Sequence, residues 1–265
     1  MNIVVLIKQV PDNTKLKADQ VAGNTLPEDG VPMMMNPYDE YALETALRLK
    51  EAAGDGAIVT AISLGAASAK EILKKALAAG ADQAFLLSDS SFSGGDSIST
   101  ANALAAGIKT LTPDYRLVVA GQMSLDNAAA QTGPMVAELL DAPSLTFGKN
   151  AELAGETLKV SRETEQGVET HDMSLPGVIC MMKCDYELRT ANIKGVMKAN
   201  KTEIPLKTAA DLGLAATDIG KDGAKTEIQK IWQRPEKSGG TVIDGADANT
   251  AVAQLVEQLK TAKVV

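Results

Sequence analysis

Aromatic residues are scarce in this sequence, at 3% of its 265 residues. Proteins that bind single-stranded nucleic acids or sugars stack them on aromatic side chains, so this composition argues against such a role. The net charge of -8 also argues against general binding to nucleic acid. With 45% hydrophobic residues, the chain can still bury a full core, which must consist of Ala, Val, Leu, Ile and Met.

Cysteine and histidine are almost absent. The two cysteines, Cys180 and Cys184, cannot form a disulfide framework, and the sequence offers no further Cys or His at a spacing that would complete a zinc site. The single histidine, His171, stands in the polar run 168–172, which is typical of an exposed strand. We therefore predict no metal site, and no catalytic residue at His171.

Long apolar runs are also missing. The apolar run at residues 1–7 is interrupted by Lys8 too soon for a signal peptide, and no stretch approaches the roughly 20 apolar residues of a membrane span. We expect a cytoplasmic protein that does not insert into membranes.

Two common nucleotide-binding motifs are also absent. The sequence has no Gly-x-Gly-x-x-Gly after the first strand and no Gly-Lys-Ser/Thr motif. Neither a Rossmann dinucleotide site nor a P-loop is therefore indicated.

The sequence does have short apolar runs that alternate with amphipathic segments. The runs have the continuous apolar character of strands buried on both faces of a parallel sheet, and they lie at residues 2–7, 57–64, 83–87 and 117–120. Helical patterns separate these runs. Pro37 stands in the first turn of one predicted helix, and Asp96 or Ser97 can cap the N-terminus of another. This alternation predicts an α/β fold with a doubly wound, mostly parallel sheet. Shorter runs beyond Ala142 predict an antiparallel section, at residues 145–148, 158–161, 168–174 and 178–182.

Three segments show little periodicity. Residues 9–35 form a long polar loop, which is either functional or a lid. Residues 183–207 form a basic loop in an otherwise acidic chain, and residues 204–240 are irregular without an obvious core of their own. We predict a nucleotide-binding α/β domain over residues 1–206. Residues 207–265 are predicted to form an extended C-terminal arm and a helix that pack on a partner subunit.

The connection after the strand at residues 117–120 carries the clearest indication of function. The strand stops at Gly121, and the small side chains of residues 128–130 let a ligand approach the backbone. Gln131-Thr132-Gly133 can offer N–H groups at the positive end of a helix dipole, where a phosphate is stabilised. The alternative is a purely structural connection, with Thr132 as the helix cap and Pro134 in the first turn. The loop 94–97 is a weaker phosphate-binding candidate.

Nearly the whole chain resembles the β (small) subunits of electron transfer flavoproteins. The resemblance rests on several motifs, of which the last two are highly specific together. They are residues 4–12, 35–40 and 79–82, Asp126 with residues 131–133, residues 162–180 ending in Leu-Pro-Gly-Val-Ile-Cys, and residues 189–199 beginning with Arg-Thr-Ala-Asn-Ile-Lys.

The resemblance implies a heterodimer with an α subunit that holds most of the FAD. This chain would help to hold that FAD, would bind AMP or a second FAD, and would belong to the adenine-nucleotide-binding type of α/β fold. Electrons would pass between dehydrogenases, such as those of the acyl-CoA dehydrogenase type, and an acceptor. The chain would then be an electron-carrier subunit rather than a stand-alone enzyme.

The resemblance also assigns residues to two sites. Cofactor contacts would be made by Leu6, Asn36, Pro37, Tyr38, Leu64, Gly121, Asp126, Ala128, Ala129, Ala130, Gln131 and Thr132. A dehydrogenase would dock at the loop around Ile193, with Arg189, Lys194 and Lys198, where charge complementarity steers the encounter.

Two questions stay open at this point. Bifurcating relatives, which use NADH, usually show Arg where this chain has Gln122, and Gly-Asp-Thr where it has residues 127–129. Gln131-Thr132-Gly133 favours AMP, whereas the amino-terminal motif and residues 95–97 resemble bifurcating members, which hold a second FAD. The competing class of protein is a non-catalytic nucleotide-binding sensor or stress-type α/β protein. That class would leave the basic loop and the C-terminal arm without an explanation.

Overall fold

The computed structural model describes residues 1–15, 30–232 and 239–265. These residues form two compact units, Met1–Ile231 and Trp232–Val265. The predicted boundary between residues 206 and 207 falls inside the first unit, where a strand of the sheet crosses it. Part of the predicted polar loop, residues 16–29, lies outside the described residues.

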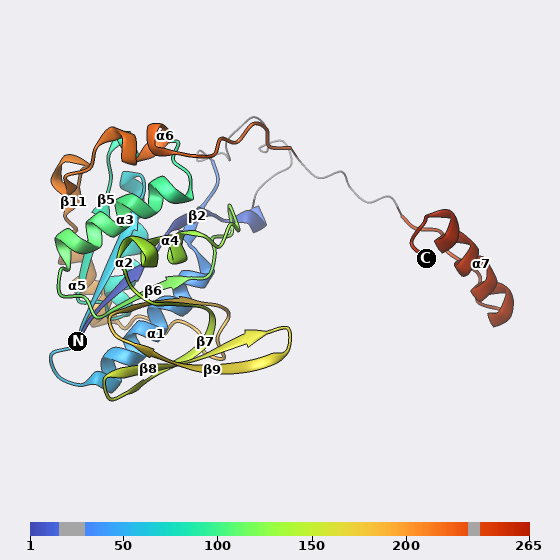
Figure 1. Ribbon diagram of the computed structural model, residues 1–265, viewed down its shortest axis with the longest axis horizontal. Coiled ribbons are helices and arrows are strands. Elements are labelled where there is room, and N and C mark those ends of the chain that lie inside the picture. Colours follow the sequence, from blue (N-terminus) through green and yellow to red (C-terminus); the bar gives the residue numbers. More distant parts are fainter. Residues whose placement is uncertain (16–29, 233–238) are drawn as a thin grey trace. The chain divides into compact units, whose positions relative to one another are not determined.

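A nine-stranded sheet forms the centre of the first unit, with the order β11-β5-β4-β1-β6-β10-β7-β8-β9 (Figure 1). Every pairing from β11 to β7 is parallel, and β7, β8 and β9 pair in antiparallel fashion. The predicted α/β fold with a mostly parallel sheet and an antiparallel section is therefore confirmed. The strands are β1 (Asn2–Leu6), β4 (Ile58–Leu64), β5 (Gln83–Leu87), β6 (Leu117–Gly121), β7 (Ser144–Ala154), β8 (Thr157–Thr164), β9 (Gly167–Ser174), β10 (Gly177–Met181) and β11 (Leu206–Lys207).

The four apolar runs form β1, β4, β5 and β6, as predicted, because helices cover both faces of this part of the sheet. The run at residues 178–182 differs from its prediction. It forms β10, which lies parallel between β6 and β7 rather than in the antiparallel section, and all five of its residues are buried. Its sequence, Gly-Val-Ile-Cys-Met, is as continuously apolar as that of β6.

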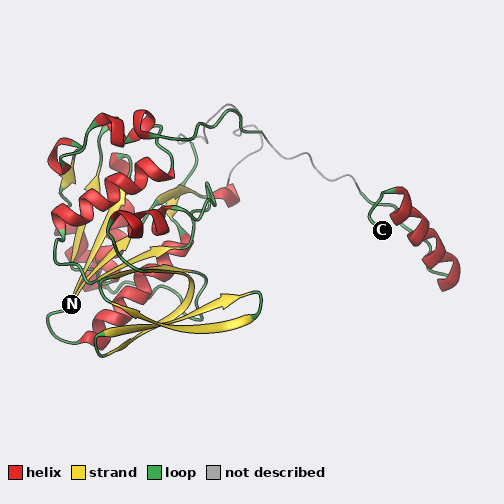
Figure 2. Ribbon diagram, in the orientation of Figure 1, coloured by secondary structure: helices red, strands yellow, loops and turns green. Residues whose placement is uncertain are grey.

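The helices lie in two layers on either side of the sheet (Figure 2). One layer contains α1 (Pro37–Ala53), α2 (Lys70–Ala79) and α5 (Ile193–Lys201), and the other contains α3 (Ser97–Leu111), α4 (Thr132–Leu139) and the short α6 (Gly220–Gly223). Helix α1 starts at Pro37, and the carboxylate of Asp96 caps α3, both as predicted. No helix in the described ranges is long and apolar enough to cross a membrane.

Two predicted loops contain secondary structure. In the first, β2 (Gln9–Pro11) pairs with β3 (Met33–Met35). The second contains α5, which starts where the side chain of Asn192 accepts a hydrogen bond from the N–H of Gly195 at 2.8 Å. Gly195 lies against α2, where a Cβ atom would collide with the carbonyl oxygen of Ala78. The cap and this close packing form the helix, although the sequence pattern shows little periodicity.

The first part of the predicted arm packs on its own chain. β11 pairs with β5, and Leu212 and Ile219 are buried beside α3. The backbone N–H groups of Lys225 and Thr226 then donate to Asp96 at 2.8 and 2.9 Å. As far as Thr226, this irregular segment therefore packs on the first unit of its own chain.

The second unit contains α7 (Ala248–Thr261), which lies within the region where the C-terminal helix is expected. Asp247 caps it by accepting from the N–H groups of Asn249 and Thr250. Within this unit, three apolar side chains of α7 are exposed at helical spacing: Val252, Leu255 and Val256. Such a stripe on a helix is typical of a surface that packs against another element.

Candidate functional site

A cavity of about 210 Å³ lies at the carboxyl ends of β1, β4 and β6. The chain runs from β1 to β4 and β5 on one side and then returns to β6 on the other, so β1 and β6 flank the point where the strand order reverses. Open α/β sheets bind ligands at this point. The lining residues include Leu6, Lys8, Asn36, Asp39, Leu64, Asp96, Gly121, Gln122, Asn127, Ala129, Ala130, Gln131, Thr132 and Gly133.

The floor of the cavity is built around the buried carboxyl group of Asp39. Its two oxygens accept from the backbone N–H of Lys8 at 2.7 Å and from the side-chain amide of Asn36 at 2.9 Å. Burial raises the pKa of Asp39 to about 7, against these hydrogen bonds and that of the Gly121 N–H, which act to lower it. Asp39 therefore joins the ends of β1 and β6 to the first turn of α1.

Gly121 allows the end of β6 to approach that first turn. A Cβ atom at this position would lie 2.8 Å from two atoms of Tyr38, and closer still to a carboxylate oxygen of Asp39. Any side chain here would force the strand and the helix apart. The sequence indicated only that the strand ends at Gly121, whereas the structure shows why glycine is required.

The loop at residues 122–131 closes one side of the cavity. The amide of Asn36 holds it, donating to the carbonyl of Met123 at 2.9 Å and accepting from the N–H of Leu125 at 3.2 Å. The ammonium group of Lys8 binds both carboxylate oxygens of Asp126, at 2.8 and 2.6 Å. Further along the loop, Ala128 and Ala130 have φ angles of 54° and 55°. This left-handed conformation is uncommon for alanine and is often found at ligand sites.

Two helix N-termini face the cavity, and they differ in charge. At α3, the carboxylate of Asp96 accepts from the N–H groups of Ile98 and Ser99, both at 3.1 Å. Burial would raise the pKa of Asp96, but these bonds and those from Lys225 and Thr226 hold it at about 2. At α4, residue Gln131 occupies the cap position and its side chain makes no capping hydrogen bond. The alternative interpretation, in which Thr132 caps the helix, is therefore wrong on this point, since Thr132 is the first residue of the helix.

The structure brings most of the predicted cofactor residues together. Eight of them line the cavity: Leu6, Asn36, Leu64, Gly121, Ala129, Ala130, Gln131 and Thr132. Four others do not line it, although each is next to a lining residue in the sequence: Pro37, Tyr38, Asp126 and Ala128. The prediction left out Lys8, Asp39 and Gln122, although Lys8 follows β1 and Gln122 follows β6 directly in the sequence. The positions of Lys8 and Gln122 just after strands could therefore have identified them as residues of the cavity from the sequence alone.

The predicted docking residues divide into two groups. Ile193, Lys194 and Lys198 lie on α5 with exposed side chains, and 79% of Ile193 is accessible to solvent. Arg189 instead binds the buried carboxylate of Glu44, with its Nε 2.9 Å from one oxygen and a terminal nitrogen 3.0 Å from the other. Arg189 also pairs with Glu51. Arg189 therefore holds the segment before α5 onto α1.

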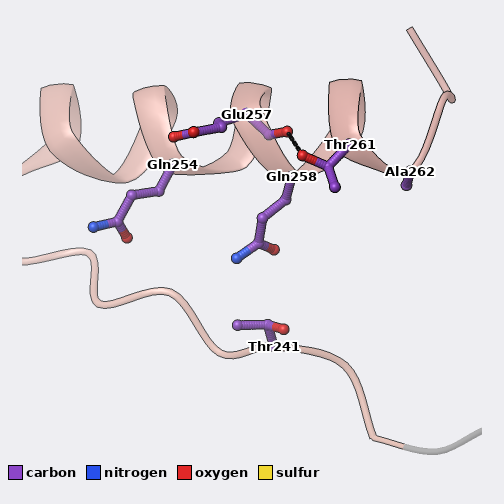
Figure 3. Close-up of a pocket in the computed structure, with 6 residues that line it drawn as sticks. All are labelled: Thr241, Gln254, Glu257, Gln258, Thr261 and Ala262. Carbon is purple, nitrogen blue, oxygen red and sulfur yellow. Dashed lines mark hydrogen bonds between the residues drawn. The ribbon is translucent and has the colours of Figure 1, made fainter.

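A second hollow, of about 560 Å³, lies in the second unit between α7 and the segment around Thr241 (Figure 3). It is larger than the cavity at the strand ends, yet polar side chains from a single helix form most of its wall, including Gln254 and Gln258. A hydrogen bond from Thr261 to the carbonyl of Glu257 at 2.9 Å is internal to the helix. We regard the smaller cavity as the functional site because several strands and two helix ends converge on it.

The side chains that could carry out chemistry are buried or dispersed. Burial raises the pKa of the Cys180 thiol to about 12, and burial also raises the pKa of Cys184. His171 is a half-buried residue of β9 that pairs with Glu169 at 3.0 Å. Within the described ranges, no three His, Cys, Asp or Glu side chains are grouped to hold a metal ion. The arrangement suits binding and positioning of a ligand.

The fold and the cavity define a doubly wound α/β protein with a cavity at its topological switch point, where proteins of this class bind ligands. Residues 23–212 match the family described as "Electron transfer flavoprotein domain". The chain is 38% identical over 272 residues to electron transfer flavoprotein subunit beta of Megasphaera elsdenii, with 100% of both chains covered. For the same subunit of Clostridium acetobutylicum, the identity is 39% over 260 residues, covering 98% of both chains.

A third relative is the caffeyl-CoA reductase-Etf complex subunit CarD of Acetobacterium woodii, which is 35% identical over 268 residues, with 100% of both chains covered. The chain belongs to the electron transfer flavoprotein β-subunit family. This assignment supports a role in electron transfer and decides against the sensor or stress-type alternative.

Proposed function

We propose that this chain forms a heterodimer with an α subunit, helps to hold the FAD of that heterodimer, and binds an adenine nucleotide in the cavity at its strand ends. FAD supplies the acceptance and release of electrons when it is bound. The residues of this chain bind and orient the nucleotides and the partner proteins. We expect the heterodimer to act in the cytoplasm as an electron carrier between dehydrogenases and an acceptor.

The observation that carries the nucleotide proposal is the uncapped N-terminus of α4. The first N–H groups of a helix have no partner within the helix, and the dipole gives them positive character. Ala130 is left-handed, whereas Gln131 has φ and ψ of -106° and -31°, which is right-handed. Successive residues of alternating hand aim their N–H groups at one point and form an anion-binding concavity. Because a carboxylate already occupies the N-terminus of α3, a phosphate is favoured at α4.

The size of the cavity favours AMP over a second FAD. A volume of about 210 Å³ is below the roughly 300–1,000 Å³ of pockets for drug-sized ligands. Gln122, at the position where bifurcating relatives usually show Arg, is buried and accepts from the backbone N–H of Phe147 at 2.6 Å. Its amide therefore ties β6 to β7. A second FAD, and with it a bifurcating complex that uses NADH, remains the other form of the proposal.

The exposed apolar stripe of α7 supports an α-subunit contact for the C-terminal arm. Val252, Leu255 and Val256 are between 40% and 59% exposed within the second unit. Burying such side chains in a partner would contribute roughly 1.5–3 kcal/mol each. We therefore assign residues 239–265 to the interface with the α subunit, whereas residues 206–226 belong to the first unit.

The surface of α5 supports the docking of a dehydrogenase. Three apolar side chains, Ile193, Val196 and Met197, are 79%, 42% and 55% exposed. Lys194 and Lys198 stand among them with exposed side chains. An exposed apolar centre with surrounding cations suits a transient encounter, because the charges steer association and the apolar group provides affinity. The relative CarD is, by its name, a subunit of a complex with a CoA-linked reductase.

The substitution Thr132→Asp tests the nucleotide site. A carboxylate in the first turn suits a helix, so the fold should persist, but it would repel a phosphate at the same N–H groups. We expect acid extracts of the variant heterodimer to contain much less adenine nucleotide from this site. Thr110→Asp, at an exposed position of α3, makes the same change far from the cavity and should leave the nucleotide content unchanged. Undiminished nucleotide in the Thr132→Asp variant would rule out this placement.

A further inference from the structure

The charge of the cavity wall needs a cation if a phosphate is to bind there. Lys8 is the only Lys or Arg among the described residues that line the cavity, whereas Asp39 and Asp96 both line it. The helix dipole of α4 is equivalent to about half a positive charge. The 5′-phosphate of AMP carries more than one negative charge at neutral pH, and the pyrophosphate of FAD carries two over its two phosphates. The helix alone therefore does not balance a phosphate beside these carboxyl groups.

The backbone of Lys8 is fixed, while its side chain is accessible. Its N–H donates to Asp39 at 2.7 Å, and its carbonyl accepts from the N–H of Asn36 at 2.9 Å. The side chain is 45% exposed, and its ammonium group lies 2.6 Å from the nearer oxygen of Asp126. Asp126 belongs to the loop that leads directly into α4. Its carboxylate therefore holds the ammonium group on the loop that precedes the N–H groups of α4.

We propose that Lys8 is a phosphate-binding residue of the nucleotide site, and that Asp126 holds its ammonium group beside the phosphate. This inference rests on the nucleotide site proposed above. It applies to the adenosine 5′-phosphate that AMP and FAD share. Asp126 acts through Lys8, which explains how a residue that does not line the cavity takes part in the site.

The test compares AMP with adenosine, which lacks the phosphate, on the heterodimer after its nucleotide has been removed. Lys8→Gln should weaken AMP binding about tenfold or more, because it removes a charge-assisted bond to the phosphate. Adenosine binding should change by less than about twofold. Lys8→Arg keeps the charge and should retain most of the preference for AMP. Binding constants from calorimetry would measure each effect.

A matched control removes a similar ion pair elsewhere. Lys50 binds both oxygens of Asp82 at 2.7 Å, at the amino ends of the strands. Lys50→Gln should leave both affinities unchanged. Asp126→Asn should weaken AMP binding less than Lys8→Gln does, because the ammonium group is still present.

Three results would contradict the assignment. Equal weakening of AMP and adenosine by Lys8→Gln would show that Lys8 only ties the loop in place. An Asp126→Asn variant that loses as much AMP affinity as Lys8→Gln would show that the site needs the ion pair rather than the ammonium group. An AMP affinity unaffected by Lys8→Gln would exclude Lys8 from the site. A wild-type heterodimer that binds no AMP would instead contradict the proposed nucleotide site itself.

Discussion

Replacing Gly121 by alanine should damage the nucleotide site through one added methyl group. The new Cβ would lie 2.8 Å from both the carbonyl carbon and the Cβ of Tyr38, where van der Waals contact requires about 3.5–4.0 Å. The end of β6 and the first turn of α1 must then separate by roughly 1 Å. Overpacking of this kind costs about 1–3 kcal/mol. It would also displace the carboxyl group of Asp39, which holds the floor of the cavity.

We therefore expect Gly121→Ala to lower the thermal midpoint of the heterodimer by several degrees and to weaken AMP binding at least about tenfold. Calorimetry would measure both. Gly65→Ala is a matched control, because its Cβ would only touch the Cβ of Ala69 at 3.5 Å. That variant should be as stable as the wild type or slightly more stable, since alanine restricts the unfolded chain. A Gly121→Ala variant with wild-type midpoint and affinity would refute the close approach of β6 to α1.

Three further predictions concern docking, the Arg189 pair and pH. Ile193→Ala should slow electron transfer from the partner dehydrogenase, with flavin content and melting temperature unchanged. The control Val168→Ala, which changes an exposed side chain of β9, should leave the rate of electron transfer unchanged. Earlier melting of the Ile193→Ala variant with loss of flavin would place Ile193 in the core. Arg189→Ala should destabilise the chain by about 3 kcal/mol at neutral pH, because it leaves the carboxylate of Glu44 buried without this partner. The loss of stability should be smaller near pH 4, where Glu44 can take a proton. An equal loss at both pH values would contradict this explanation. Burial raises the pKa of Asp39 to about 7, so the folded state favours the neutral carboxyl group. The stability that this preference contributes is full below about pH 4 and is lost as the pH rises through 7. Asp39→Asn should remove that part of the pH dependence of the thermal midpoint, and an unchanged profile would show that Asp39 stays ionised.

Much of the fold could be predicted because its signals are local. The runs that form β1, β4, β5 and β6 are continuously apolar, and Pro37 and Asp96 start helices by their own geometry. The signal failed where the pairing partner is distant in the sequence. The sequence predicts β10 as a strand but assigns it to the antiparallel section, because its five residues carry no information that β6 is its neighbour.

Helix α5 and the cavity floor show the same limit more clearly. Gly195 of α5 packs closely on Ala78 of α2, and these residues are more than a hundred positions apart. The contacts of Lys8 with Asp39 and Asp126 span 31 and 118 positions. Eight of the twelve cofactor residues that the family resemblance implies line the cavity. The contacts of Asp39 and Lys8 that organise the cavity could not be predicted, because they form only when the fold brings the strand ends together.

The nucleotide content of the unmodified heterodimer tests the central claim most directly. Acid extraction followed by chromatography would count the FAD and AMP released for each heterodimer. We expect an adenine nucleotide beyond the FAD shared with the α subunit: one FAD with one AMP for a simple carrier, or two FAD for a complex capable of bifurcation. A heterodimer that releases one FAD and no second nucleotide would contradict it.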